Sequence, residues 1–215
     1  MTDERLVHRL EAFSDVVIGF VLAEMAITLS VPKTLPTSSD LGLNLLAFAM
    51  TFGLVSVLWY MHNRLFAYYF VANAPMIGMN FVMLGGLIIM GYLFGIALHF
   101  ADQPGWTRLM ALWFYCFALV YALLGAMYGL GSYLRRAELD ARTFAAGVMR
   151  CGSAIVVGII FVWLGVTFAR APDPSALHLI SPWTGIAIAA VVLTLRLVGT
   201  RWLASRRASQ NVAKA

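Results

Sequence analysis

The chain has 215 residues, of which 61% are apolar and 12% charged, and its mean hydropathy is +0.84. Charged residues approach a quarter of an ordinary soluble domain, so this composition excludes that class and predicts an integral membrane protein. The net charge of +5 does not indicate a nucleic-acid partner, because the basic residues fall between apolar runs and at the C-terminus without interleaved aromatic residues.

The apolar runs predict an all-α, polytopic membrane protein with six transmembrane helices. A spanning helix needs roughly 20 mostly apolar residues, and the breaks between runs carry proline, glycine or charge, as at Pro32 and Pro36. We expect one transmembrane domain over residues 1–205, followed by a short basic tail, 206–215. The six predicted helices span residues 12–31, 41–62, 75–99, 107–131, 147–169 and 179–200.

The distribution of lysine and arginine predicts that both termini are cytoplasmic, because positively charged loops are retained on that side of the membrane. Three basic residues fall on the opposite side of a six-pass chain: Lys33, Arg108 and Arg170. The other twelve fall on the cytoplasmic side: Arg5, Arg9, Arg64, Arg135, Arg136, Arg142, Arg150, Arg196, Arg201, Arg206, Arg207 and Lys214.

Glu24 interrupts the first apolar run and is the first candidate for a functional residue. A helical wheel places Phe13, Phe20 and Thr28 within about 40° of it, whereas Asp15 falls about 180° away. A carboxylate in the bilayer core is costly unless it meets water, a partner or a proton. Glu24 is therefore either a functional group or a protonated side chain hydrogen-bonded between helices.

The second predicted helix ends with Ser56, Trp59 and His62 on adjoining turns of one side. His62 and Asp15 both lie near the cytoplasmic boundary, so a hydrogen-bonded network between the first two helices is one interpretation. The alternative is an aromatic anchor at the level of the lipid headgroups.

Several chemistries lack their motifs. The chain has no phosphate-binding loop, nucleophile elbow or HExxH motif, so we do not expect an enzyme. Cys116 and Cys151 form no CxxC or Cys/His cluster, and we expect no metal site or cofactor. A TVGYG-type potassium filter is also absent, so any ion selection would fall to helix side chains.

The first two helices carry a more specific pattern. Arg9-x-x-x-Phe13-Ser14-Asp15, followed by an apolar run that ends at Pro32, resembles the signature of the transmembrane protein 175 family of cation channels. Trp59 and His62 resemble that family's tryptophan and histidine in the second helix. The six-pass layout is similar to that of the short prokaryotic members.

The resemblance implies a potassium-permeable channel in a prokaryotic plasma membrane, assembled as a homotetramer, with potassium and also other monovalent cations or protons as permeant ions. It implies that the first helix of each subunit lines the pore, with Phe20, Glu24 and Thr28 facing the conduction path. Structural residues near the cytoplasmic end would then be Arg9, Phe13, Ser14, Asp15, Trp59 and His62.

The sequence departs from the family in the pore helix itself. Phe20 stands where members have a constricting isoleucine, Glu24 where they have a leucine and Ala23 where they have a threonine, and Thr28 falls at the outer rung. We therefore expect a hydrophobic constriction at Phe20 and a pH-sensitive site for cations at Glu24. Two other functions fit the altered helix: a proton-coupled carrier that uses Glu24, and a non-conducting membrane scaffold.

Overall fold

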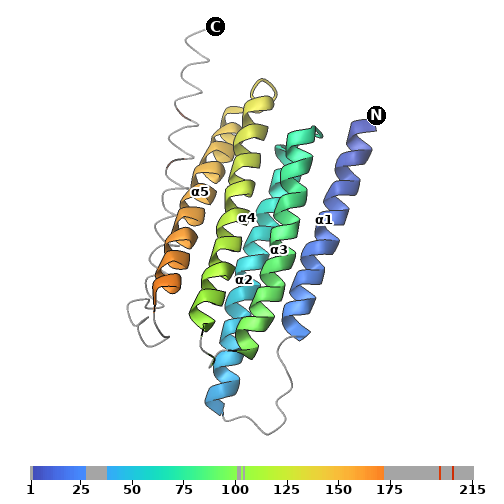
Figure 1. Ribbon diagram of the computed structural model, residues 1–215. Helices are drawn as coiled ribbons and strands as arrows, with labels where there is room; N and C mark the ends of the chain where they lie inside the picture. The colour runs from blue at the N-terminus through green and yellow to red at the C-terminus, as the bar shows by residue number, and fades with distance from the viewer. Residues whose placement is uncertain are drawn as a thin grey trace.

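The described part of the chain is entirely helical apart from short connections. The computed structural model describes residues 2–27, 38–100, 103, 105–171, 199 and 205. It contains five helices within these ranges (Figure 1): α1 (Thr2–Ile27), α2 (Ser38–Tyr68), α3 (Ala74–His99), α4 (Trp106–Leu134) and α5 (Ala141–Arg170). The predicted sixth helix, 179–200, and Thr28 lie outside the described residues, apart from position 199.

Helix boundaries follow local chemistry. Asn73 caps α3 by accepting a hydrogen bond from the Met76 amide at 3.0 Å, and Pro75 occupies the first turn, where a missing amide hydrogen costs nothing. Asp140 caps α5 by accepting bonds from the amides of Arg142 and Thr143. The chain enters α4 at Gly105, whose φ of 93° is a conformation that favours glycine.

Three of the helices are long and apolar enough to cross a membrane by length and composition: Ala74–Ala97, Trp106–Leu134 and Ala141–Arg170. The described part of α1 is not among them, because Glu11, Asp15 and Glu24 all lie in its C-terminal two thirds. Together the helices make this a membrane protein; the six-pass layout and the cytoplasmic location of both termini stay predictions.

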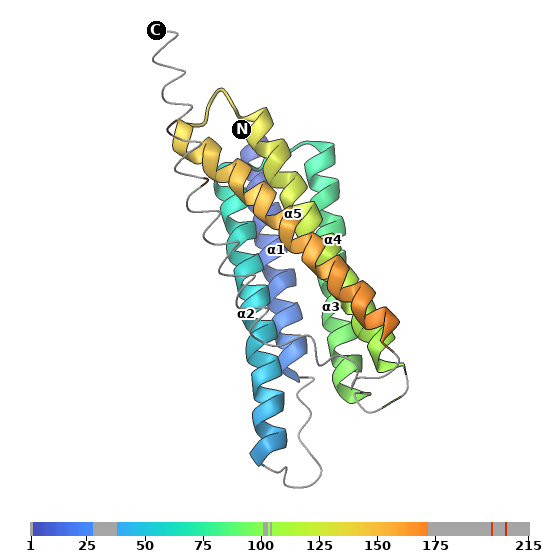
Figure 2. The ribbon, with the colours of Figure 1, turned by 90° about the vertical axis from the view of Figure 1, so that its left-hand side faces the viewer.

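The helices pack side by side into an elongated bundle (Figures 1 and 2). α4 packs most extensively against α5, α3 packs against α4, and α1 packs against both α3 and α2. α1 and α5 therefore lie at opposite edges of the bundle. The N-terminus, the α2–α3 connection and the α4–α5 connection all lie at one end, at the top of Figure 1.

One continuous apolar core joins all five helices. Its fully buried members include Leu58 and Leu65 of α2, Leu87 of α3 and Leu124 of α4. α1 contributes a buried line at three- and four-residue spacing, the signature of one helix face directed inward: Leu10, Ser14, Ile18, Val21 and Met25.

Glycines allow the tightest approach where the α2–α3 connection meets α4 and α5. A Cβ on Gly131 would overlap the carbonyl oxygen of Tyr69 and lie 3.0 Å from its carbonyl carbon, and a Cβ on Gly147 would overlap the Tyr69 ring. The Tyr69 hydroxyl donates a 2.7 Å hydrogen bond to the Thr143 carbonyl. Tyr69 therefore fixes the α2–α3 connection to both C-terminal helices.

Candidate pore helix and polar network

Ser14 begins a buried polar chain that joins the first three helices. Its side chain faces the core because it shares the inward face of α1, and its hydroxyl donates to the Leu10 carbonyl at 2.7 Å. The same hydroxyl accepts a 3.1 Å bond from the Nδ2 amide of Asn80 on α3. Asn80 Oδ1 lies 2.9 Å from Nε2 of His62 on α2. All three side chains are fully buried.

The second ring nitrogen of His62, Nδ1, is buried and has no hydrogen-bond partner within the described ranges. The ring packs on Phe66, with centroids 4.7 Å apart. The contact with Asn80 is thus the one described hydrogen bond that holds this imidazole among apolar neighbours. The Ser14–Asn80–His62 network therefore fixes the relative position of α1, α2 and α3.

Asp15 and Phe13 make separate contacts on either side of Ser14. Asp15 Oδ1 accepts a 2.9 Å bond from the Trp59 indole nitrogen on α2. Phe13 meets Phe81 of α3 edge-on, with centroids 6.0 Å apart, although it remains 49% exposed. Three successive residues of α1 thus contact both neighbouring helices.

The structure brings together Ser14, Asp15, Trp59 and His62 from the predicted motif, but not Arg9. Arg9 is exposed and makes no hydrogen bond or ion pair with the described part of the chain. Sequence reasoning missed Asn80, which links Ser14 to His62. Its signal was available, because it is the one side-chain amide in the otherwise apolar predicted helix 75–99.

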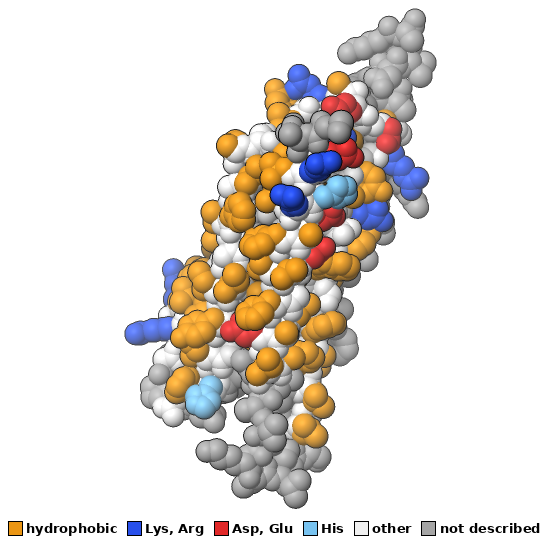
Figure 3. Space-filling view, turned by 90° about the vertical axis from the view of Figure 1, so that its right-hand side faces the viewer, with side chains coloured by type: hydrophobic (Ala, Val, Ile, Leu, Met, Phe, Trp, Pro, Cys, Tyr) orange, Lys and Arg blue, Asp and Glu red, His pale blue; other side chains and the backbone are white. Residues whose placement is uncertain are grey.

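The outer face of α1 is apolar and has no described neighbour over much of its area. Val16, Phe20 and Ile27 are 70%, 64% and 80% exposed, and Gly19 and Ala23 between them are exposed as well. Figure 3 views the bundle from this edge and shows hydrophobic side chains over most of it, with acidic groups scattered among them. Such a continuous apolar face on a bundle edge indicates a surface for lipid or for another subunit.

Glu24 lies at the flank of this face rather than at its centre. It is half-buried, and its Oε2 atom is 3.6 Å from the position that a Cβ on Gly91 of α3 would occupy. The missing side chain of Gly91 leaves the room in which the carboxylate rests. Glu24 makes no hydrogen bond or ion pair within the described residues, and these residues contain no cluster of three His, Cys, Asp or Glu groups that could hold a metal.

The fold and this site define a helical membrane protein with a polar network behind an exposed apolar helix and no cluster of catalytic groups in the described ranges. Residues 9–90 match the family model described as "Endosomal/lysosomal potassium channel TMEM175". The chain also resembles the solved structure of the potassium channel MtTMEM175, a threonine-to-alanine variant in complex with a nanobody-MBP fusion protein. No curated protein matches the chain.

The structural match has 17% sequence identity and a TM-score of 0.53, and it covers 96% of this chain and 94% of that channel. At this identity it shows the shared fold. The family match covers residues 9–90 and agrees with the resemblance that the motif indicated. Both matches are to ion channels, and the prediction that the chain is not an enzyme is confirmed.

Proposed function

We propose that this protein is a potassium-permeable cation channel in which four copies of α1 surround a central pore. The family description and the structural relative both name potassium channels. The observation that carries the pore assignment is the outer face of α1: Val16, Phe20 and Ile27 are the most exposed large apolar side chains of this helix in one subunit. A fourfold assembly would bring these faces together around its axis.

Phe20 is the proposed hydrophobic constriction. Phe20 is the largest side chain on the outer face of α1, and hydrophobic constrictions control ion flow by excluding water. The Ser14–Asn80–His62 network and the Asp15–Trp59 bond lie within two turns of Phe20 along α1 and hold the helix at a fixed angle to its neighbours. The network supports the pore helix without taking part in conduction.

Glu24 is the proposed cation site next to this constriction. It lies one helical turn from Phe20, and its position beside Gly91 leaves the carboxylate without a described partner that would neutralise it. Four carboxylates near one axis would attract cations. Protonation would weaken that attraction, so we expect the cation current to fall as the pH is lowered.

The test is ion flux through purified protein in liposomes, with potassium, sodium and protons compared between pH 5 and 8. We expect Phe20→Ala to raise the cation flux and Glu24→Gln to lower the potassium flux and flatten its pH dependence. Ile159→Ala is the matched control for Phe20→Ala, because Ile159 is 63% exposed on α5 at the opposite edge of the bundle; its flux should equal that of the wild type.

Three outcomes would contradict the proposal. Saturable flux of one substrate, coupled to protons, would indicate a carrier that uses Glu24. An absence of current at every pH would indicate a scaffold. Equal effects of Phe20→Ala and Ile159→Ala would show that the exposed face of α1 contacts lipid and does not line the pore.

A further inference from the structure

Most of the described arginines lie toward one end of the bundle, where acidic residues of α1 and of the α4–α5 connection also lie. Two of the described arginines lie at the opposite end of the bundle: Arg108 near the start of α4 and Arg170 at the end of α5. Seven lie toward the end that holds the N-terminus and the α2–α3 and α4–α5 connections (Figure 1): Arg5, Arg9, Arg64, Arg135, Arg136, Arg142 and Arg150. Anionic lipid would therefore be attracted to an arginine of this end that no acidic group neutralises.

Arg64 differs from the other arginines of this end because two tyrosines of its own helix hold it. Its Nε donates to the Tyr60 hydroxyl at 3.3 Å, and its Nη1 donates to the Tyr68 hydroxyl at 3.2 Å. The guanidinium carbon also lies 5.5 Å and 5.6 Å from the two ring centroids. The three residues are spaced four apart, so they form one ladder along the surface of α2.

The ladder presents charge without a compensating acid. The described ion pairs do not include Arg64, whose hydrogen-bond partners are the two neutral tyrosine hydroxyls. Both tyrosines face outward, with Tyr60 50% and Tyr68 41% exposed. A guanidinium that donates one hydrogen from Nε and one from Nη1 still has the second Nη1 hydrogen and both Nη2 hydrogens available for an anionic acceptor such as a phosphate or carboxylate.

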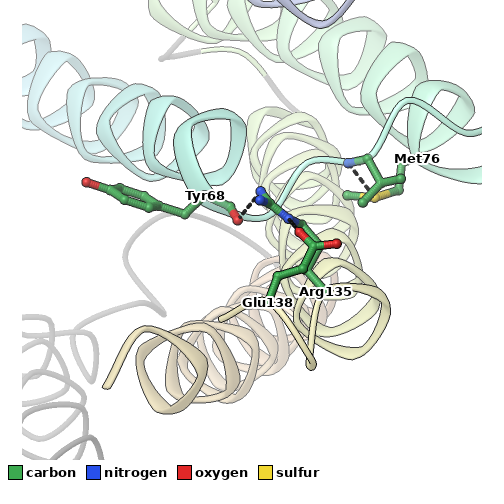
Figure 4. A network of polar contacts seen from close by, with 5 residues as sticks. Tyr68, Met76, Arg135 and Glu138 are labelled. Carbon is green, nitrogen blue, oxygen red and sulfur yellow. Dashed lines mark hydrogen bonds and ion pairs between the residues drawn. The ribbon is translucent and has the colours of Figure 1, made fainter. Parts of the chain in front are cut away.

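Tyr68 is held by a separate contact from Arg135, the residue that caps the C-terminus of α4. Arg135 Nη1 donates to the Tyr68 carbonyl at 2.7 Å, and its Nε pairs with Glu138 at 3.0 Å. Figure 4 shows the Tyr68 ring pointing away from Arg135, so the two arginines use opposite sides of the same residue. Since Arg135 is already neutralised by Glu138, the uncompensated charge at Tyr68 belongs to Arg64.

The position of the ladder along α2 selects the ligand. Arg64 lies two residues after His62, where the predicted apolar run ends, which is the level at which lipid headgroups meet the hydrocarbon core. Tyrosine is enriched at that level because its ring is apolar and its hydroxyl is polar. A phosphate beside Arg64 would have its acyl chains alongside the exposed apolar residues of α2, among them Val57, which is 52% exposed.

We propose that Tyr60, Arg64 and Tyr68 form a binding site for the phosphate of an anionic phospholipid in the leaflet facing the N-terminal end of the bundle. The guanidinium supplies the charge, and the tyrosines hold its plane. The site is independent of the pore assignment, because it depends only on the surface of α2 and the level of the membrane.

The experiment measures lipid binding to the purified protein in detergent by native mass spectrometry, with phosphatidylglycerol as the probe and phosphatidylcholine as the neutral comparison. We expect tighter binding of phosphatidylglycerol and a roughly tenfold weaker affinity in Arg64→Gln, the size of effect that one charge-assisted contact supports. Arg142→Gln is the matched control, because Arg142 is exposed at the same end. We expect its affinity to stay within about twofold of the wild type.

Each contrary result overturns the proposal. Equal losses in Arg64→Gln and Arg142→Gln would show a diffuse surface charge, and equal binding of both lipids would show no preference for anionic headgroups. Displacement of the lipid by millimolar inorganic phosphate would assign the site to free phosphate. Arg64→Lys is the second variant, in case Arg64→Gln does not fold, because lysine keeps the positive charge but lacks the planar, forked donors of the guanidinium. Unchanged affinity in Arg64→Lys would refute the proposal that the tyrosines hold the guanidinium in a specific geometry.

Discussion

Replacing Asn80 by leucine tests whether the buried polar network stabilises the packing of α1 to α3. Asn80 is fully buried and makes two hydrogen bonds, to Ser14 at 3.1 Å and to His62 at 2.9 Å. Leucine keeps the size of the side chain roughly constant but forms neither bond. Ser14 keeps its bond to the Leu10 carbonyl, whereas His62 loses its described partner on Nε2.

The expected loss is the sum of two effects. Hydrogen bonds between membrane helices contribute about 0.6 kcal/mol each on average, so two bonds account for about 1.2 kcal/mol. An imidazole left buried without a partner costs about 2 kcal/mol more. We therefore expect Asn80→Leu to lower the free energy of unfolding by about 3 kcal/mol.

A double-mutant cycle with His62→Leu separates the network from simple loss of packing. When both partners become apolar, no imidazole is left stranded, so the double variant should recover about 2 kcal/mol relative to the sum of the single changes. The free energies come from reversible unfolding in mixed micelles titrated with a denaturing detergent and followed by circular dichroism. Single and double changes that add within about 0.5 kcal/mol would refute the reasoning.

Two further predictions concern the end of the bundle where α4 and α5 meet. Gly131→Ala would force a methyl group onto the Tyr69 carbonyl and should lower the stability by about 1–3 kcal/mol, although alanine is the better helix former. Gly152→Ala is the control, because a Cβ on Gly152 meets no atom within 4 Å, and it should leave the stability unchanged or raise it. Equal melting temperatures of the two variants in detergent would contradict this account. Asp140 caps α5, and bonds from the Thr143 side chain and the backbone hold its pKa below the ordinary 3.8. Its stabilisation is therefore complete above pH 3.8 and lost as the pH falls through the lowered pKa, so the melting temperature of the wild type should drop more below pH 4 than that of Asp140→Asn; parallel pH profiles would show that the cap contributes nothing.

Part of the site was readable in the sequence because it depends on one helix at a time. The helical wheel directs Asp15 and Glu24 toward different neighbours and places Phe20 and Glu24 on adjoining turns of α1. In the structure Asp15 contacts Trp59 of α2, Glu24 lies beside Gly91 of α3, and Phe20 faces outward. Whether Phe20 and Glu24 line a pore stays a prediction, and Thr28 lies outside the described residues.

Composition and periodicity by themselves determined that this chain is a helical membrane protein, because apolar length and the 3.6-residue repeat are properties of each segment alone. The tertiary structure decided which polar groups meet. Asn80 lies between Ser14 and His62, Glu24 rests beside Gly91 at the flank of the exposed face, and Tyr69 fills the space left by Gly131. These contacts depend on the register and rotation of helices that are distant in sequence, and such quantities are set by side-chain packing between helices.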